Sequence, residues 1–320
     1  MQRRYILIFV MAAGLIFALD ASAGQSAMAP ASQSLPEFGQ EVGTAERTSD
    51  PVTEAVNRQQ PHAQRIAAVE RIADLSAPGA QKAMIDYLIR PLPGRPLPGM
   101  DGDRGAEYEL RNNMLNKLRE HSAEPRAVTE ALLKIYRDPG QEDVLRGYAV
   151  QHIAGWIRTG VLASGDREQL LAAIRDAATK VDNPVIGGAG LIALREVGPA
   201  EEAGAFAMNV LRSGNACPES RISAFQVCAE LGVDKAIGPA RAVLADRNAP
   251  AILRMSAVNV LARLGGPADE RLLQELSTGG SGEIRGRSAE QNIKAGRPEN
   301  DELVRNAARL ALAARKSEGK

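Results

Sequence analysis

Apolar residues recur with helical spacing along most of the chain. The clearest stretch begins after Pro250 and ends before Gly265-Gly266-Pro267. Proline suits the first turn of a helix, and a Gly-Gly-Pro run stops one. One face of this predicted helix carries Leu253, Ala257, Val260, Leu261 and Leu264. This amphipathic pattern predicts a buried α-helix, followed by a second helix over Asp269–Leu276.

An arginine recurs at the matching position of successive predicted helices, with glycine replacing it once. The series is Arg65, Arg111, Arg146, Gly187, Arg221, Arg254 and Arg285. The steps between its members range from 31 to 46 residues, which is the period of helical-hairpin solenoids. The sequence therefore predicts a repeat protein.

Three other columns keep the same register. Each member of this series is called an anchor residue. Three residues after each anchor residue the side chain is small in six of the seven repeats: Ala68, Met114, Ala149, Gly190, Ala224, Ala257 and Ser288. Seven residues after it the column is apolar until the last repeat: Ile72, Leu118, Ile153, Leu194, Cys228, Leu261 and Asn292. Eight residues before it stand Asn57, Asp103, Asp138, Thr179, Ser213, Asp246 and Ser277, residue types that cap helices or close turns.

Shorter partner helices are expected between the anchored helices, which are the helices that carry an anchor residue. Their predicted ranges are Ala80–Arg90, Pro125–Arg137, Asp166–Val181, Ala200–Arg212, Lys235–Ala245 and Asp269–Leu276, with a closing helix at Glu299–Lys316. No segment alternates long enough to predict a strand. The predicted fold is all-α: a right-handed helical-hairpin solenoid, an α-α superhelix of about seven helical pairs.

The segment from Lys235 to Gly265 resembles a HEAT repeat. It has a helix ending in Asp246, a turn with Pro250, and Leu253-Arg254-Met-Ser-Ala257, which is similar to the family's Val-Arg-x-x-Ala signature. Leu145-Arg146-Gly-Tyr-Ala149 with Asp138 matches as well, and the likeness extends over residues 57–316 but departs at Gly187. The resemblance implies a ladder of bonds between the Asp and Arg columns, formed by Asp138, Arg146, Arg221, Asp246, Arg254 and Arg285.

The N-terminus has the features of a secretory signal peptide. Arg3 and Arg4 precede an apolar run, and Ala21-Ser22-Ala23 fits a cleavage site. We expect cleavage after residue 23, a disordered leader over 24–56, the solenoid over 57–316 and a flexible tail over 317–320. The expected location is periplasmic or secreted, with no stable membrane insertion after cleavage.

Charge argues against a nucleic-acid partner. Cleavage of the signal peptide removes Arg3, Arg4 and Asp20 and leaves 37 basic and 38 acidic residues. Nucleic-acid binding needs a basic surface, which this balance does not supply. The two cysteines are expected to be unpaired, because eleven residues of helix place Cys217 and Cys228 roughly 16 Å apart.

Several side chains are candidates for binding. The guanidinium groups of Arg146 and Arg254 would stand in a row that suits carboxylates or phosphates, although the structural ladder explains the same arginines. Arg90 and Arg95 flank a tandem Pro-Leu-Pro-Gly segment, which is either a recognition loop or a stiff crossover. His152 and Trp156 lie one turn apart, either on a binding groove or as a surface histidine beside a partly buried aromatic residue.

Metal binding has one candidate segment. Asp101, Asp103 and Glu107 alternate near glycines as in a calcium loop, but Gly105 and Asn112 depart from the EF-hand pattern. No catalytic set, metal site or cofactor is indicated. The sequence therefore favours an exported, non-enzymatic scaffold that binds another protein along a concave surface. The alternatives are a HEAT-like lyase or other enzyme handling a small ligand, and a calcium-dependent envelope or adhesion module.

Overall fold

The structure, a computed structural model, describes residues 50–77, 79–92, 104–160, 162, 164–278 and 298–317. Within these residues the chain forms α-helices and one 3₁₀ turn, and no strand. The helices are α2 (Pro51–Val56), α3 (His62–Arg71), α4 (Ala80–Leu88), α5 (Gly105–His121), α6 (Pro125–Arg137), α7 (Asp143–Arg158), α8 (Ser164–Thr179), α9 (Ile186–Val197), α10 (Ala200–Arg212), α11 (Pro218–Leu231), η1 (Asp234–Ala236), α12 (Ile237–Ala245), α13 (Ala251–Leu264), α14 (Pro267–Thr278) and α16 (Pro298–Ser317).

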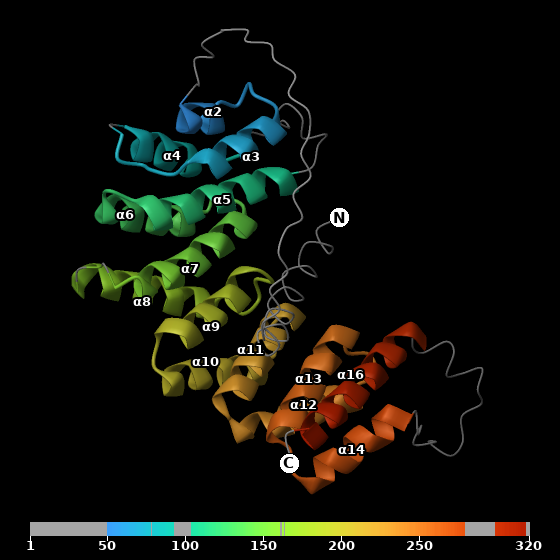
Figure 1. The fold of residues 1–320 in the computed structure, drawn as a ribbon. Helices are drawn as coiled ribbons and strands as arrows, with labels where there is room; N and C mark the ends of the chain where they lie inside the picture. Colours follow the sequence, from blue (N-terminus) through green and yellow to red (C-terminus); the bar gives the residue numbers. More distant parts are fainter. Residues whose placement is uncertain are drawn as a thin grey trace, which may run out of the picture.

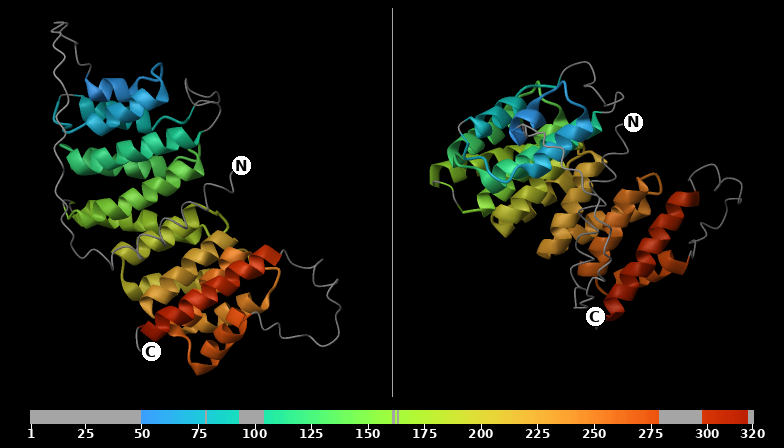
Figure 2. Two further views of the ribbon diagram at one scale, coloured as in Figure 1. Left: turned by 45° about the vertical axis from the view of Figure 1, so that its right-hand side comes forward. Right: turned by 45° about the horizontal axis from the view of Figure 1, so that its top comes forward.

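The helices stack as successive hairpins in chain order (Figure 1). The anchored helices α3, α5, α7, α9, α11 and α13 pack on one another as one layer, and α2, α4, α6, α8, α10 and α12 form the partner layer. The same succession of helices, coloured from blue to red, is visible from other sides (Figure 2). The all-α helical-hairpin solenoid is thereby confirmed. No helix in the described parts of the chain is long and apolar enough to cross a membrane.

The core follows the two apolar columns of the repeat. The small column is buried at Ala68, Met114, Ala149, Gly190, Ala224 and Ala257, and the larger one at Ile72, Leu118, Ile153, Leu194, Cys228 and Leu261. Small side chains bring neighbouring helices close, and the larger ones fill the space between the layers. The last members, Ser288 and Asn292, lie outside the described residues, as does Arg285.

The N-terminal boundary of the packed structure differs from the expected one. Residues 24–56 were expected to form a leader without structure, but α2 lies within that range. Its Val52 and Ala55 are buried, and the helix packs on α3 and α4. Asp50 caps it by accepting a hydrogen bond from the Thr53 amide at 2.9 Å. The packed solenoid therefore includes residues 51–56.

Steric crowding explains why residue 187 is a glycine. A Cβ atom there would lie 2.4 Å from the Lys180 carbonyl oxygen, and one at Gly190 would lie 2.3 Å from the Ala178 nitrogen. The backbones of α8 and α9 thus approach too closely for any side chain at these positions. This close approach explains why the arginine of the repeat is missing here.

The helix α16 completes the C-terminal end by packing on both α13 and α14. Its Asp301 accepts a hydrogen bond from Arg254 of α13 at 2.7 Å. Its Arg315 donates to the carbonyls of Leu261 and Gly265, where α13 ends. Cationic side chains are favourable at the carboxyl end of a helix because its last carbonyls lack partners within the helix.

Candidate functional site

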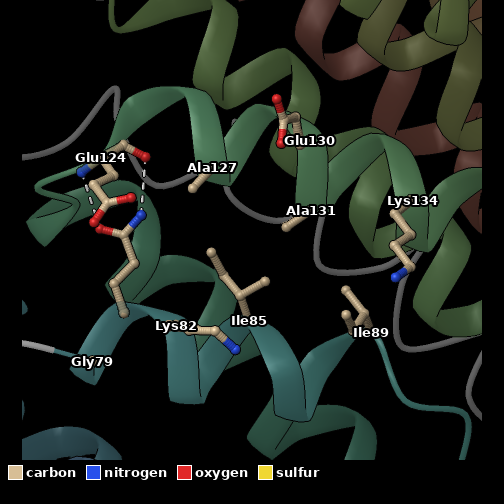
Figure 3. Close-up of a pocket in the computed structure, with 10 residues that line it drawn as sticks. Gly79, Lys82, Ile85, Ile89, Glu124, Ala127, Glu130, Ala131 and Lys134 are labelled. Carbon is tan, nitrogen blue, oxygen red and sulfur yellow. Dashed lines mark hydrogen bonds between the residues drawn. The ribbon is translucent and has the colours of Figure 1, made fainter.

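A groove of about 380 Å³ lies between α4 and α6 of the partner layer. Its floor is apolar and consists of Ile85 and Ile89 from α4 and Ala127 and Ala131 from α6. The isoleucines and Ala127 are only partly buried. Figure 3 shows these four side chains between the two helices, with polar side chains at both ends. A concave, mainly apolar surface with a few polar groups is typical of a small-ligand site.

One end of the groove is fixed by Gln81, which is buried. Its Nε2 donates to the Glu124 carbonyl oxygen at 2.9 Å. Its Oε1 accepts from the amides of Ala123 and Glu124 at 3.0 and 3.1 Å, and from the Ser122 hydroxyl at 3.2 Å. The side chain therefore holds α4 to the connection between α5 and α6.

The other end is fixed by a second buried glutamine. Gln141, on the connection between α6 and α7, donates from Nε2 to the Ile89 carbonyl oxygen at 2.8 Å. Both ends of α4 are thus bonded to the next repeat, while its middle stands apart from α6. The spacing of the groove is consequently set before any ligand arrives.

The charged side chains around the groove fall into two groups. Lys82 pairs with Asp86, and Glu130 pairs with Arg126 at 3.1 Å, both along one helix face. Glu124 and Lys134 line opposite ends of the groove, and within the described residues neither side chain has an ion-pair partner. Figure 3 shows Lys134 beside Ile89 at one end and Glu124 at the other end. The groove thus offers a free carboxylate at one end and a free ammonium at the other.

A buried ionic cluster joins the first two hairpins next to this site. Glu107 accepts from Arg65 Nη1 at 3.1 Å and from Arg111 Nε at 3.0 Å, and all three side chains are buried. The Tyr87 hydroxyl donates to Glu107 and accepts from Arg65. Burial raises the pKa of Tyr87, as does the Glu107 charge. Tyr87 therefore stays neutral inside this cluster.

The calcium candidates are not brought together as metal ligands. Glu107 is occupied by two guanidinium groups and is enclosed within the fold, which corrects its assignment as a calcium ligand. Asp101 and Asp103 lie outside the described residues. Among the residues that are described, no cluster of three or more His, Cys, Asp or Glu side chains could hold a metal ion.

The recurring arginines cap the ends of partner helices. Arg65 Nε donates to the Ala55 carbonyl, and Arg111 Nη1 to those of Leu88 and Arg90. Arg146 Nε donates to the Tyr136 carbonyl at 2.9 Å, and Arg221 Nη2 to that of Ser213 at 2.9 Å. Each acceptor lies at or just beyond the carboxyl end of the preceding helix. These arginines therefore satisfy terminal carbonyls and do not form an open row for anions.

The Asp–Arg ladder needs the same correction. Asp138 and Asp246 occupy the C-cap positions of α6 and α12, and each accepts the backbone amide two residues later, at 2.8 and 2.9 Å. Arg146 instead pairs with Asp143 at 2.9 Å, and Arg254 with Asp301. The aspartates close turns, because a short carboxylate reaches its own turn more easily than the next helix.

His152 and Trp156 are both buried, so neither lies on an open groove or at the surface. The Trp156 indole donates to the Thr129 hydroxyl at 3.1 Å. His152 Nε2 shares a hydrogen bond of 2.9 Å with Asn112 Oδ1. Burial, with a smaller contribution from Arg119, lowers the pKa of His152 to about 3. The ring is neutral and serves the packing of α5 on α7.

The remaining candidates do not gather at the groove. The side chain of Arg90 is exposed and its carbonyl accepts from Arg111. Arg95 lies outside the described residues. Cys217 precedes α11 and Cys228 lies on its buried face, and both thiols are free. Sequence reasoning missed Gln81, Gln141, Glu124 and Lys134, because no repeat column contains them.

Comparisons with known proteins yield one structural likeness. No protein-family model matches the chain, and no curated protein sequence matches it. Among solved structures, human deoxyhypusine hydroxylase in complex with glycerol matches over 82% of this chain and 93% of the other. The TM-score is 0.31 and the sequence identity 17%.

This finding corrects the expectation of a non-enzymatic scaffold. That expectation rested on architecture alone, and the solved structure that matches this chain is that of a hydroxylase. A solenoid therefore gives no ground for calling this chain a non-enzymatic scaffold, and we withdraw that interpretation. A likeness of this degree assigns no activity to the chain, so function must be argued from the groove.

Proposed function

We propose that this protein binds a small apolar ligand with a charged group at each end, in the groove between α4 and α6. The ligand class that fits is a short free oligopeptide with apolar side chains. The observation that carries the proposal is the apolar floor between the free Glu124 carboxylate and the free Lys134 ammonium. The proposal concerns binding and includes no reaction.

The length of the ligand follows from the helix geometry. Glu124 and Lys134 are ten residues apart along α6, which corresponds to about 15 Å at 1.5 Å per residue. An extended peptide advances about 3.3 Å per residue, so four or five residues span this distance. The peptide's N-terminal ammonium would lie at Glu124 and its C-terminal carboxylate at Lys134.

Preorganisation supports the proposal. Binding is weakened when a site must be ordered first, and the two glutamine side chains already fix the separation of α4 from the next repeat. The apolar floor supplies contact area, whereas the end charges select a ligand of the correct length. Affinity is expected to be modest, because the charged ends remain exposed to solvent.

Isothermal titration calorimetry with a free tetrapeptide of alanine and leucine tests this function. We expect saturable 1:1 binding that weakens about tenfold in Lys134→Gln, because one charge-assisted hydrogen bond is lost. Lys235→Gln, which removes an exposed lysine on η1, is the matched control and should bind as the wild type does. Absence of binding to the wild type, or equal affinities in Lys134→Gln and the wild type, would contradict the proposal.

We also propose that this HEAT-like protein is exported. The support is the charged and apolar pattern of residues 1–23 with its Ala21-Ser22-Ala23 site, which lies outside the described residues. Intact-mass measurement on protein expressed with residues 1–23 should give a chain beginning at Gly24 in the exported fraction. A full-length chain retained in the cytoplasm would overturn this proposal and leave the groove proposal unaffected.

A further inference from the structure

The ionic cluster around Tyr87 contains more positive than negative charge. Three guanidinium groups, those of Arg58, Arg65 and Arg111, lie 5.0 to 5.1 Å from the centre of the Tyr87 ring. Glu107 is the carboxylate that the described residues place among them. A buried excess of positive charge is unfavourable unless an anion compensates it.

Two nitrogen atoms of this cluster have unused hydrogen-bonding capacity. Arg111 Nη2 and Arg58 Nη2 are both buried, and neither has a hydrogen-bond partner among the residues that the structure describes. The Arg111 side chain is fully buried, and its other guanidinium nitrogens are bonded to Glu107 and to the carbonyls of Leu88 and Arg90. Buried guanidinium N–H groups without acceptors are rare, because their desolvation is not repaid.

Both unpartnered groups lie around the Tyr87 ring. Each guanidinium carbon is about 5 Å from the same ring centre, so the two carbons are at most about 10 Å apart. Where two guanidinium groups face the same space, one oxyanion accepts hydrogen bonds of about 2.8 Å from both, and guanidinium groups match the geometry of carboxylate and phosphate oxygens. Arg58 lies on the connection between α2 and α3 and is only partly buried, so an anion can reach the cluster past it.

We infer that Arg58 and Arg111, beside Tyr87, form a binding site for an oxyanion, either a free phosphate or the carboxylate of a small organic acid. The anion bridges the two unpartnered Nη2 atoms and compensates the excess charge of the cluster. This site is separate from the groove, because Tyr87 packs on the buried side of α4 while Ile85 and Ile89 line the groove.

Thermal unfolding with added anions tests the site. Inorganic phosphate and acetate are titrated separately at constant ionic strength, with chloride as the balancing anion. We expect one of the two to raise Tm in a saturable manner while chloride alone does not, and the responding anion identifies the class. Equal Tm values in all three salts would overturn the inference.

Variants locate the effect. Arg58→Gln removes a partly exposed arginine and should raise the apparent Kd of the responding anion at least tenfold. Arg167→Gln removes an exposed arginine on α8 and should leave the Kd unchanged. If Arg58→Gln fails to fold, Arg58→Lys keeps the charge and loses the planar fork, and should still raise the Kd. An unchanged Kd in the folded Arg58 variant would contradict this assignment.

Discussion

At the scale of single residues, two buried glutamines fix the ends of α4 and thereby the shape of the groove. Gln81 forms four hydrogen bonds to the segment Ser122–Glu124, and Gln141 forms one to the Ile89 carbonyl. An amide suits position 81 because it donates and accepts at once, whereas Gln141 uses its donor alone. The groove is therefore shaped by hydrogen bonds between repeats as well as by packing.

Replacing Gln81 tests this role. Gln81→Ala leaves the amides of Ala123 and Glu124 and the Glu124 carbonyl without this partner, so we expect a loss of about 2–3 kcal/mol in the free energy of unfolding. Urea denaturation monitored by circular dichroism measures it. Lys82→Ala, an exposed neighbour, should change stability by less than about 0.5 kcal/mol. Similar losses in the two variants would show that Gln81 has no special role.

The buried histidine predicts a pH dependence of stability. His152 has a folded-state pKa of about 3, well below the ordinary value of 6.5, because burial disfavours the charged ring. Above pH 6.5 the ring is neutral in both the folded and the unfolded state, and His152 costs no stability through protonation. As pH falls from 6.5 toward 3 only the unfolded state takes up the proton, so the free energy of unfolding falls by about 1.4 kcal/mol per pH unit. Between pH 7 and pH 5 the wild type should lose about 2 kcal/mol more than His152→Gln in urea denaturation. Parallel losses in the two proteins would refute this explanation.

Some residue roles were open to prediction from sequence and others were not. The buried apolar columns follow from spacing alone, because helical period and burial are directly linked. The role of Glu107 was not predictable in the same way, since its partners Arg65 and Tyr87 come from two earlier helices. The burial of His152 likewise depends on how α5 and α7 pack.

At the scale of helices, arginines at carboxyl ends recur as a device for joining elements. Four anchored arginines donate to carbonyls where a partner helix ends. Arg309 of α16 does the same for α14 by donating to the Ser277 carbonyl at 2.9 Å. The sequence showed the recurrence of the arginines, but the HEAT-like aspartates suggested the wrong partner.

Glycines control the distance between α8 and α9. A Cβ at Gly190 would lie 2.3 Å from the Ala178 nitrogen, whereas one at Gly238 in α12 would meet no atom within 4 Å. Gly190→Ala should therefore destabilise the protein by about 3 kcal/mol or more, because α9 must move away from α8. Gly238→Ala should cost far less, because the added methyl group meets no neighbouring atom. Thermal unfolding compares them, and equal Tm values would exclude the close approach of α8 and α9.

At the scale of the whole molecule, the solenoid was predictable because each repeat carries the same spacing of apolar residues. The groove was not, because it arises where the repeat is irregular. The step from Arg65 to Arg111 is 46 residues, the longest in the series, and α4 has 9 residues where α6 has 13. A shorter helix bonded at both ends leaves space beside a longer one.

The central claim, that the groove binds a short apolar peptide through both of its charged ends, is tested most directly with two peptides of one sequence. The first is a tetrapeptide of alanine and leucine with free termini, and the second is the same peptide acetylated and amidated. Calorimetric titration should show binding of the free peptide and at least tenfold weaker binding of the blocked one, since the blocked peptide cannot pair with Glu124 and Lys134. Equal affinity for the two peptides, or binding of neither, would contradict the claim.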